Sequence, residues 1–184
     1  MLPSEHQKWE SLSRESILDK KPWFEVFRES VRLPDGKVVP EYYGIEMPHY
    51  TAVFAVTEDQ KIMVLRCYRH AIGEVTLTMP GGMIEGGESP LEGIQREFLE
   101  ETGYVASEWK SLGSFMGNST RGCGTYYLFF ANGACSVQEP DSGDLEDLEL
   151  LLLSPREVEQ AVDERKAQSL GVLSMLLLGL HCLK

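Results

Sequence analysis

The chain has 184 residues, of which 29 are acidic and 17 basic, so its formal net charge at pH 7 is −12. This length suits one domain with a full hydrophobic core and a short extension. The negative charge argues against a protein that binds nucleic acid polymers or membrane surfaces by bulk electrostatic attraction. An anionic ligand would therefore need a bound divalent cation or a few well-placed arginines.

The cysteines and the apolar segments indicate the compartment. The four cysteines form no CxxC pair and have no close spacing to a histidine, which predicts neither a zinc site nor a redox motif. The longest apolar stretches, Leu148–Leu153 and Leu170–Leu180, are too short to span a bilayer, and the first residues lack a signal-peptide pattern. We therefore expect a cytoplasmic protein with reduced thiols and no membrane contact.

Residues 1–47 form a candidate N-terminal extension that is rich in β-structure. Trp23–Leu33 alternates like a strand, Pro34–Gly36 is a turn, and Lys37–Ile45 continues as the second arm of a hairpin. The sequence thus predicts an N-terminal β-hairpin, followed by a single domain over residues 48–184.

The remaining segments alternate between strand and helix patterns. Tyr50–Val56 and Lys61–Tyr68 predict a second hairpin, with longer strands. Further strands are predicted over Trp109–Phe115, Thr125–Ala131 and Glu149–Leu153, and further helices over Pro155–Glu164 and Gln168–Cys182. The last of these helices has apolar residues nearly all round and is expected to be buried. Strands enclosed by helices predict an α/β sandwich with a mixed sheet.

A glycine-rich loop, Pro80–Gly87, precedes a central helix with clear end signals. Ser89 is a candidate N-cap, Pro90 suits the first helical position, and Glu92 completes a capping box. Gly103 can end the helix as a left-handed C-cap. The helix is therefore expected between Pro90 and Gly103.

Acidic residues gather on one side of this helix. At 100° per residue, Glu97 and Glu101 lie one turn apart, and Glu100 flanks them. Their mutual repulsion costs a few tenths of a kcal/mol per pair, and the helix C-terminus is already negative. A hard-cation site explains this placement, with Arg96 one turn before Glu100 to hold that carboxylate. A solvated acidic helix face is the alternative.

The segment that begins at Gly82 reads GMIEGGESPLEGIQREFLEETGY, which resembles the Nudix signature G-x5-E-x7-R-E-U-x-E-E-x-G-U, where U is a bulky apolar residue. The seven fixed positions are Gly82, Glu88, Arg96, Glu97, Glu100, Glu101 and Gly103. With each residue type near 7% of usage, a chance match in this chain is on the order of one in a million.

The Nudix resemblance implies an α/β/α sandwich and metal-assisted hydrolysis, in which metal lowers the pKa of an attacking water. It makes Glu97 and Glu101 the main ligands of Mg²⁺, with Mn²⁺ as the alternative ion. Glu100 would be a further ligand or the base, and the Gly81 carbonyl would join the metal. The resemblance gives structural roles in the motif to Gly82, Glu88 and Gly103, and a catalytic role to Arg96.

The run VLRCYRHAIGEVTLTMPGGMIEGGE resembles the ADP-ribose pyrophosphatase group within this family. That resemblance implies hydrolysis of ADP-ribose or a related nucleoside diphosphate sugar to a nucleoside monophosphate and a sugar phosphate. It also implies a homodimer formed through the N-terminal strands. Trp23 would stack on adenine, with core packing as the alternative, and Arg69 would contact phosphate or ribose. Many members of the group carry Ala where this chain has Gly81.

A GDP-sugar or dinucleotide pyrophosphatase and a nucleoside triphosphate pyrophosphatase are alternative enzymes, and a non-catalytic nucleotide-binding regulatory module is the alternative outside enzymology. The resemblance also implies an acid before the last strand, acting as a base or an added metal ligand, and Glu146 in the run DSGDLEDLELLLL best matches it. A solvated acidic loop is the other interpretation of that run, and Glu100 is the other candidate base.

Overall fold

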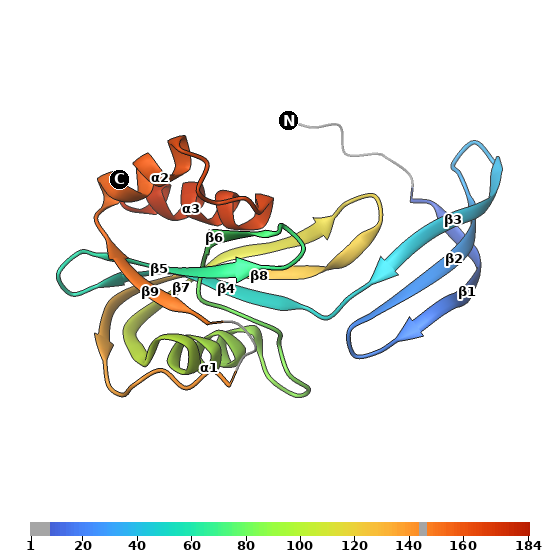
Figure 1. Ribbon diagram of the computed structural model, residues 1–184. Coiled ribbons are helices and arrows are strands. Elements are labelled where there is room, and N and C mark those ends of the chain that lie inside the picture. The colour runs from blue at the N-terminus through green and yellow to red at the C-terminus, as the bar shows by residue number, and fades with distance from the viewer. Residues whose placement is uncertain (1–7, 144–146) are drawn as a thin grey trace. The chain divides into compact units, whose positions relative to one another are not determined.

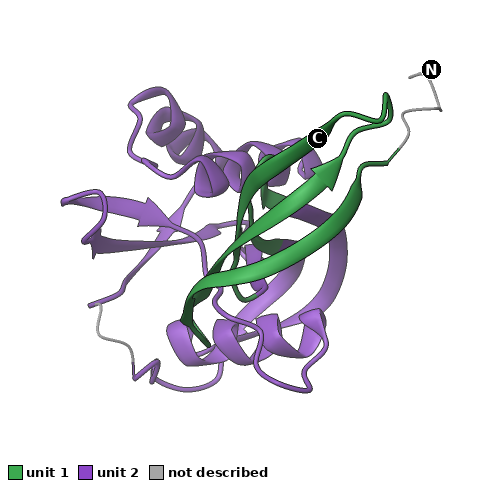
Figure 2. Cartoon of the chain, turned by 90° about the vertical axis from the view of Figure 1, so that its right-hand side faces the viewer, with its two compact units in different colours: residues 1–48, 116–125 green, residues 49–115, 126–184 purple. Residues whose placement is uncertain are grey.

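A computed structural model describes residues 8–143 and 147–184. Within it the chain divides into two compact units, drawn in green and purple in Figure 2. The first unit comprises residues 1–48 with 116–125, and the second comprises residues 49–115 with 126–184. The expected boundary after residue 47 concerns the organisation of domains and stays a prediction.

The first unit contains a three-stranded antiparallel sheet, formed by β1 (Glu10–Lys20), β2 (Phe24–Arg32) and β3 (Val38–Glu46). The hairpin formed by β2 and β3 confirms the strands expected in this region. Strand β1 was not expected from the sequence. Two register shifts interrupt its pairing with β2, and all eleven of its residues are exposed, so it lacks the alternation that marks a half-buried strand.

The second unit is built on a mixed sheet. Its strands are β4 (Tyr50–Thr57), β5 (Ile62–Arg69), β6 (Glu74–Thr78), β9 (Glu149–Leu153) and most of β7 (Tyr104–Asn118) and β8 (Gly122–Ser136). Strands β4 and β8 are parallel, whereas β5 pairs antiparallel with β4, β6 and β9. The mixed sheet confirms the expected α/β class. Strand β6 was not expected.

Helices cover both faces of this sheet, with α1 (Pro90–Thr102) on one side and α2 (Pro155–Asp163) and α3 (Leu170–Cys182) on the other (Figure 1). On the first side the fully buried Ile94 and Phe98 of α1 pack in one apolar cluster with residues of β4 and β8. Full burial of such a side chain stabilises the fold by about 1.5–3 kcal/mol. The central helix that carries the acidic residues is therefore fixed to the sheet by its opposite, apolar side.

The last helix, α3, is buried on one side only. Met175 and Leu176 are buried, but Leu170 is 79% exposed and Leu177 is 52% exposed. The expectation of a helix buried all round was therefore wrong for this face, because a helix that covers a sheet contacts it along one side.

None of the helices in residues 8–143 and 147–184 has the length and the apolar character of a membrane-spanning helix.

The packing of α3 on β4 gives a stability prediction. A methyl group added at the buried Gly179 would lie 2.0 Å from the ring of Phe54, which is fully buried. We expect Gly179→Ala to lower the free energy of unfolding by about 1–3 kcal/mol through overpacking. Urea denaturation followed by circular dichroism measures this change.

Gly171→Ala on the same helix is the matched control. The added methyl group would have only Ser169 Oγ nearby, at 3.8 Å, so we expect no loss of stability and a gain of up to about 1 kcal/mol from helix propensity. Equal effects of the two substitutions would contradict the packing of Gly179 on Phe54.

Candidate active site

The glycine-rich loop begins as an extra extended segment along the edge of β4. Its first residues pair antiparallel with the start of that strand, with an isolated bridge between Tyr50 and Met83. Three backbone hydrogen bonds join the two segments: Val53 N to Pro80 O at 2.9 Å, Thr51 N to Gly82 O at 2.9 Å and Ile84 N to His49 O at 3.0 Å. The sheet therefore determines the path of the chain that faces the acidic helix.

Two glycines in this segment are required by close approach. Gly81 has a φ of +145°, and a Cβ there would lie 2.1 Å from the carbonyl oxygen of Thr51. A Cβ at Gly82 would lie 2.4 Å from the carboxyl carbon of Glu97. Alanine, which many members of the resembled group have at the first position, does not fit this chain at Gly81. The missing Cβ at Gly82 makes room for the Glu97 carboxylate.

The ends of α1 are fixed by local hydrogen bonds, as the sequence predicted. Ser89 Oγ accepts a bond from Glu92 N at 3.3 Å, and Glu92 Oε2 accepts one from Ser89 N at 2.8 Å. Hydrogen bonds to the Glu92 carboxylate, first from the Ser89 side chain and then from the Ser89 backbone N–H, hold the pKa of Glu92 below its usual value. At the other end, Gly103 is left-handed and its N–H donates to Leu99 O at 2.8 Å.

The guanidinium of Arg96 joins three carboxylates and a backbone carbonyl. It contacts Glu88 with two nitrogens, Nε to Oε1 at 2.8 Å and Nη2 to Oε2 at 3.1 Å. Nη1 donates to Glu97 Oε1 at 2.9 Å and to Glu100 Oε2 at 3.1 Å. Nη2 also donates to Met83 O at 3.1 Å. We call this set of contacts the Arg96 clamp, because it ties the loop to the helix.

The contacts of the clamp shift the pKa values of its members. Hydrogen bonding to Glu88, ahead of that to the other two carboxylates, raises the pKa of Arg96 above its usual value. Hydrogen bonds from Arg96 and then from the Glu85 N–H lower the pKa of Glu88. Nearby, the buried Glu101 accepts a bond from Gly81 N at 2.7 Å. One arginine thus stands among four motif carboxylates, and a further cation would offset the excess negative charge.

The side chains present fit a hard divalent cation by their chemistry. The carboxylates of Glu97 and Glu101 lie beside the backbone of Gly82 and Gly81. The atoms available here as metal ligands are carboxylate and carbonyl oxygens, which hard cations prefer. Within the described part of the chain, no group of three or more His, Cys, Asp or Glu side chains is already arranged around a common point. In this arrangement Glu97 instead contacts Arg96, and Glu101 contacts the Gly81 N–H.

Three other expected site residues have different surroundings. Trp23 lies in the turn between β1 and β2 with 67% of its surface exposed, which does not fit core packing within the chain. Arg69 ends β5 and pairs in register with Glu74 of β6. Glu146 lies outside the described residues.

The structure also brings one unexpected segment to the helix. Val137 N and Gln138 N donate to Gly103 O at 2.9 and 3.2 Å, and Asp141 N donates to Glu100 O at 2.8 Å. These bonds fix the chain that follows β8 to the C-terminal end of α1. They join residues more than thirty positions apart in the sequence, so no local pattern predicts them.

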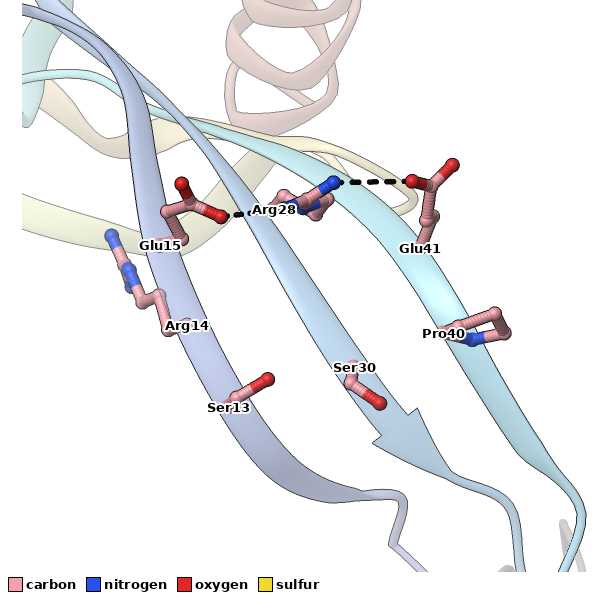
Figure 3. Close-up of a pocket in the computed structure, with 7 residues that line it drawn as sticks. All are labelled: Ser13, Arg14, Glu15, Arg28, Ser30, Pro40 and Glu41. Carbon is pink, nitrogen blue, oxygen red and sulfur yellow. Dashed lines mark hydrogen bonds and ion pairs between the residues drawn. The ribbon is translucent and has the colours of Figure 1, made fainter.

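A separate hollow of about 410 Å³ lies on the three-stranded sheet of the first unit (Figure 3). Ser13 and Ser30 line it together with an ion pair network, in which Arg28 contacts Glu15 at 2.6 Å and Glu41 at 3.1 Å. The charge of Arg28 is thus balanced by both carboxylates that line the hollow.

Comparison with known proteins identifies the family. The family model described as NUDIX domain matches residues 47–171. The chain belongs to the Nudix family. A second model, described as Nucleoside diphosphate sugar hydrolase N-terminal domain, matches residues 9–44. Nudix hydrolases generally depend on a divalent metal, which agrees with the oxygen donors at the loop and helix.

Curated relatives and a solved structure extend this result. The chain is 31% identical to an ADP-ribose pyrophosphatase of Bacillus subtilis over 57% of this chain and 56% of that protein. It is 30% identical to the methanol dehydrogenase activator of Bacillus methanolicus over 75% of each chain. The match to an ADP-ribose pyrophosphatase of Mycobacterium tuberculosis, 32% identical, covers 59% of this chain and 52% of that protein. The chain thus spans only about half the length of the two pyrophosphatases.

A crystal structure described as ADP compounds hydrolase superposes with a TM-score of 0.83, covering 98% of this chain and 97% of the other. Its sequence identity is 18%, so this likeness concerns the fold alone. The Nudix family and its α/β fold, expected from the sequence, are both confirmed.

The Arg96 clamp predicts a large difference between two Arg→Lys substitutions. Arg96→Lys keeps the charge but removes the planar group that contacts Glu88 with two nitrogens and reaches both other carboxylates. Because these groups are partly buried, we expect the free energy of unfolding to fall by about 1–2 kcal/mol. Chemical denaturation near neutral pH measures it.

Arg66→Lys is the control for this substitution. Arg66 Nε contacts Glu149 at 2.7 Å in an exposed cross-strand pair, where we expect a change within about 0.5 kcal/mol. An Arg96→Lys variant as stable as the Arg66→Lys variant would show that the clamp does not hold the loop.

Proposed function

We propose that the protein is a metal-dependent hydrolase that cleaves the diphosphate of ADP-ribose or a related nucleoside diphosphate sugar. Water adds to one phosphorus, the bond from that phosphorus to the bridging oxygen breaks, and the products are a nucleoside monophosphate and a sugar phosphate. The observation that carries this proposal is the Arg96 clamp, which sets three motif carboxylates beside the loop that carries Gly81 and Gly82.

We assign the metal to the oxygens next to that loop. Glu97, Glu101 and the Gly81 carbonyl would hold Mg²⁺, with Mn²⁺ as the alternative ion, because hard cations prefer oxygen ligands. The bound metal would supply positive charge to the diphosphate oxygens and lower the pKa of an attacking water. Arg96 positions the carboxylates, and Glu88 connects Arg96 to the loop through the Glu85 N–H.

A carboxylate must accept the proton of the attacking water, and the chain offers two candidates. Glu100 is fixed by Arg96 at the end of α1, and Glu146 belongs to the acidic sequence run DSGDLEDLELLLL. Comparison of kcat for Glu100→Gln and Glu146→Gln distinguishes them, because loss of the base lowers kcat far more than loss of a neighbouring acid.

The substrate class is supported by the N-terminal region and by the relatives. Residues 9–44 match a domain described for nucleoside diphosphate sugar hydrolases, and two relatives are ADP-ribose pyrophosphatases. Arg69 would contact the phosphate or the ribose of the bound substrate. Trp23 would stack on the base, and its 67% exposure leaves its ring accessible for that contact.

A product assay tests the proposed function. We expect release of nucleoside monophosphate from ADP-ribose, or from another sugar-linked nucleotide in a panel with GDP-mannose, UDP-glucose, diadenosine polyphosphate and a dNTP. The release should require Mg²⁺ and should fall at least about a hundredfold in Glu101→Gln, because a metal ligand is lost.

Glu92→Gln provides the matched control on the same helix. Glu92 takes part in the capping box and not in the clamp, so this variant should retain turnover. Release of pyrophosphate from the dNTP alone would instead identify a triphosphate pyrophosphatase. Binding of ADP-ribose without any metal-dependent product would identify a regulatory module and contradict the proposed hydrolase.

We also propose a cytoplasmic homodimer formed through the first unit. Its outer strand β1 exposes Leu12, Ile17 and Leu18, and long exposed edge strands favour pairing with another chain. None of the four cysteines, all of which are among the described residues, is joined in a disulfide, and a reducing compartment keeps thiols in that form. Light scattering after size exclusion should give twice the chain mass of 20.7 kDa, and a mass equal to one chain would contradict the dimer.

A further inference from the structure

One buried residue contacts both ends of the loop that precedes α1. Thr51, on β4, is 2% exposed, and its N–H donates to Gly82 O at 2.9 Å. Its hydroxyl lies 3.4 Å from the carbonyl oxygen of Pro90, the first residue of α1, and 3.3 Å from that of Tyr127 on β8. The loop from Gly82 to Pro90 therefore begins and ends on this residue.

The hydroxyl has no packing role that an apolar side chain would not fill. Val53 and Ala55 follow Thr51 on the same side of β4, and both are buried beneath α1. A buried hydroxyl costs free energy unless it is hydrogen bonded, and valine has nearly the same shape without that cost. The presence of threonine is therefore explained by its carbonyl acceptors, on α1 and on β8.

This contact complements the Arg96 clamp. Arg96 holds the interior of the loop, through Met83 and Glu88, whereas Thr51 holds its two ends against the sheet. The first turn of α1 and the backbone at Gly82 are thus both held by Thr51. The position of Glu97, about two turns into α1 and next to Gly82, depends on both.

We propose that the Thr51 hydroxyl is a positioning group that sets the separation between α1 and the Gly81–Gly82 backbone, and so the arrangement of the metal-binding carboxylates. The consequence for turnover rests on the proposed function. The consequence for the order of the loop does not, because it follows from the hydrogen bonds alone.

The test uses Thr51→Val, which removes the hydroxyl, and Thr51→Ser, which keeps it. Thr76→Val is the matched control: Thr76 is 3% exposed, and its hydroxyl donates to Lys166 O at 2.9 Å and accepts from Gln168 N at 3.1 Å on the connection before α3. Amide hydrogen exchange of residues 81–89 is measured first in each full-length variant, followed by kcat, KM and thermal midpoint.

We expect Thr51→Val to speed amide exchange in residues 81–89 by about fivefold to tenfold, the effect of losing one hydrogen bond. If the wild-type protein turns over one of the nucleotides, kcat of Thr51→Val should fall about tenfold with little change in KM, because a small displacement of catalytic groups affects mainly the reaction step. Thr51→Ser should restore both values. Thr76→Val should lower the thermal midpoint without either effect.

Unchanged loop exchange in Thr51→Val would overturn the proposal, as would faster exchange that Thr76→Val reproduces in the same residues. Equal loss of kcat in Thr51→Val and Thr76→Val would also overturn it, since a general loss of stability would then explain both. A wild-type protein that turns over none of the nucleotides contradicts the proposed function, while the exchange measurement still decides the role of Thr51.

Discussion

The contacts of Arg96 with three carboxylates are the interaction on which the site depends. Glu97 and Glu100 lie on consecutive turns of one helix, and Glu88 joins them from the loop, so their charges repel unless a cation lies among them. The guanidinium satisfies that need with a fixed, planar set of donors. It also bonds to Met83 O, which makes the helix and the loop one structural piece.

The sheet of the second unit supports both the loop and α1. The loop starts as an extended segment paired with β4, and the apolar side of α1 packs through Ile94 and Phe98 on the same sheet. The acidic side of the helix is thereby held toward the loop and the apolar side toward the core. The excess of carboxylates that results is unfavourable without a cation, which links the fold directly to the proposed metal-dependent reaction.

Local sequence signals predicted the parts of this arrangement that depend on local interactions. The capping box at Ser89, the C-cap at Gly103 and the spacing of the motif acids all act within a few residues. Features that depend on distant segments were not predictable. Strand β1 is exposed along its whole length and pairs with register shifts, so its sequence lacks the alternation of a half-buried strand. The hydrogen bond from Asp141 N to Glu100 O forms only through the fold. The contacts of Thr51 belong to the same class, since a threonine in a buried strand gives no sign of its acceptors.

We propose that Glu97, Glu101 and the Gly81 carbonyl together form a divalent cation site beside the Arg96 clamp. Anomalous diffraction from crystals grown with Mn²⁺ tests it most directly, because the ion is then located independently of any assay. We expect an anomalous peak within coordination distance of both carboxylates and of the Gly81 carbonyl oxygen. A peak on other acidic residues, with none beside Glu97 and Glu101, would contradict it.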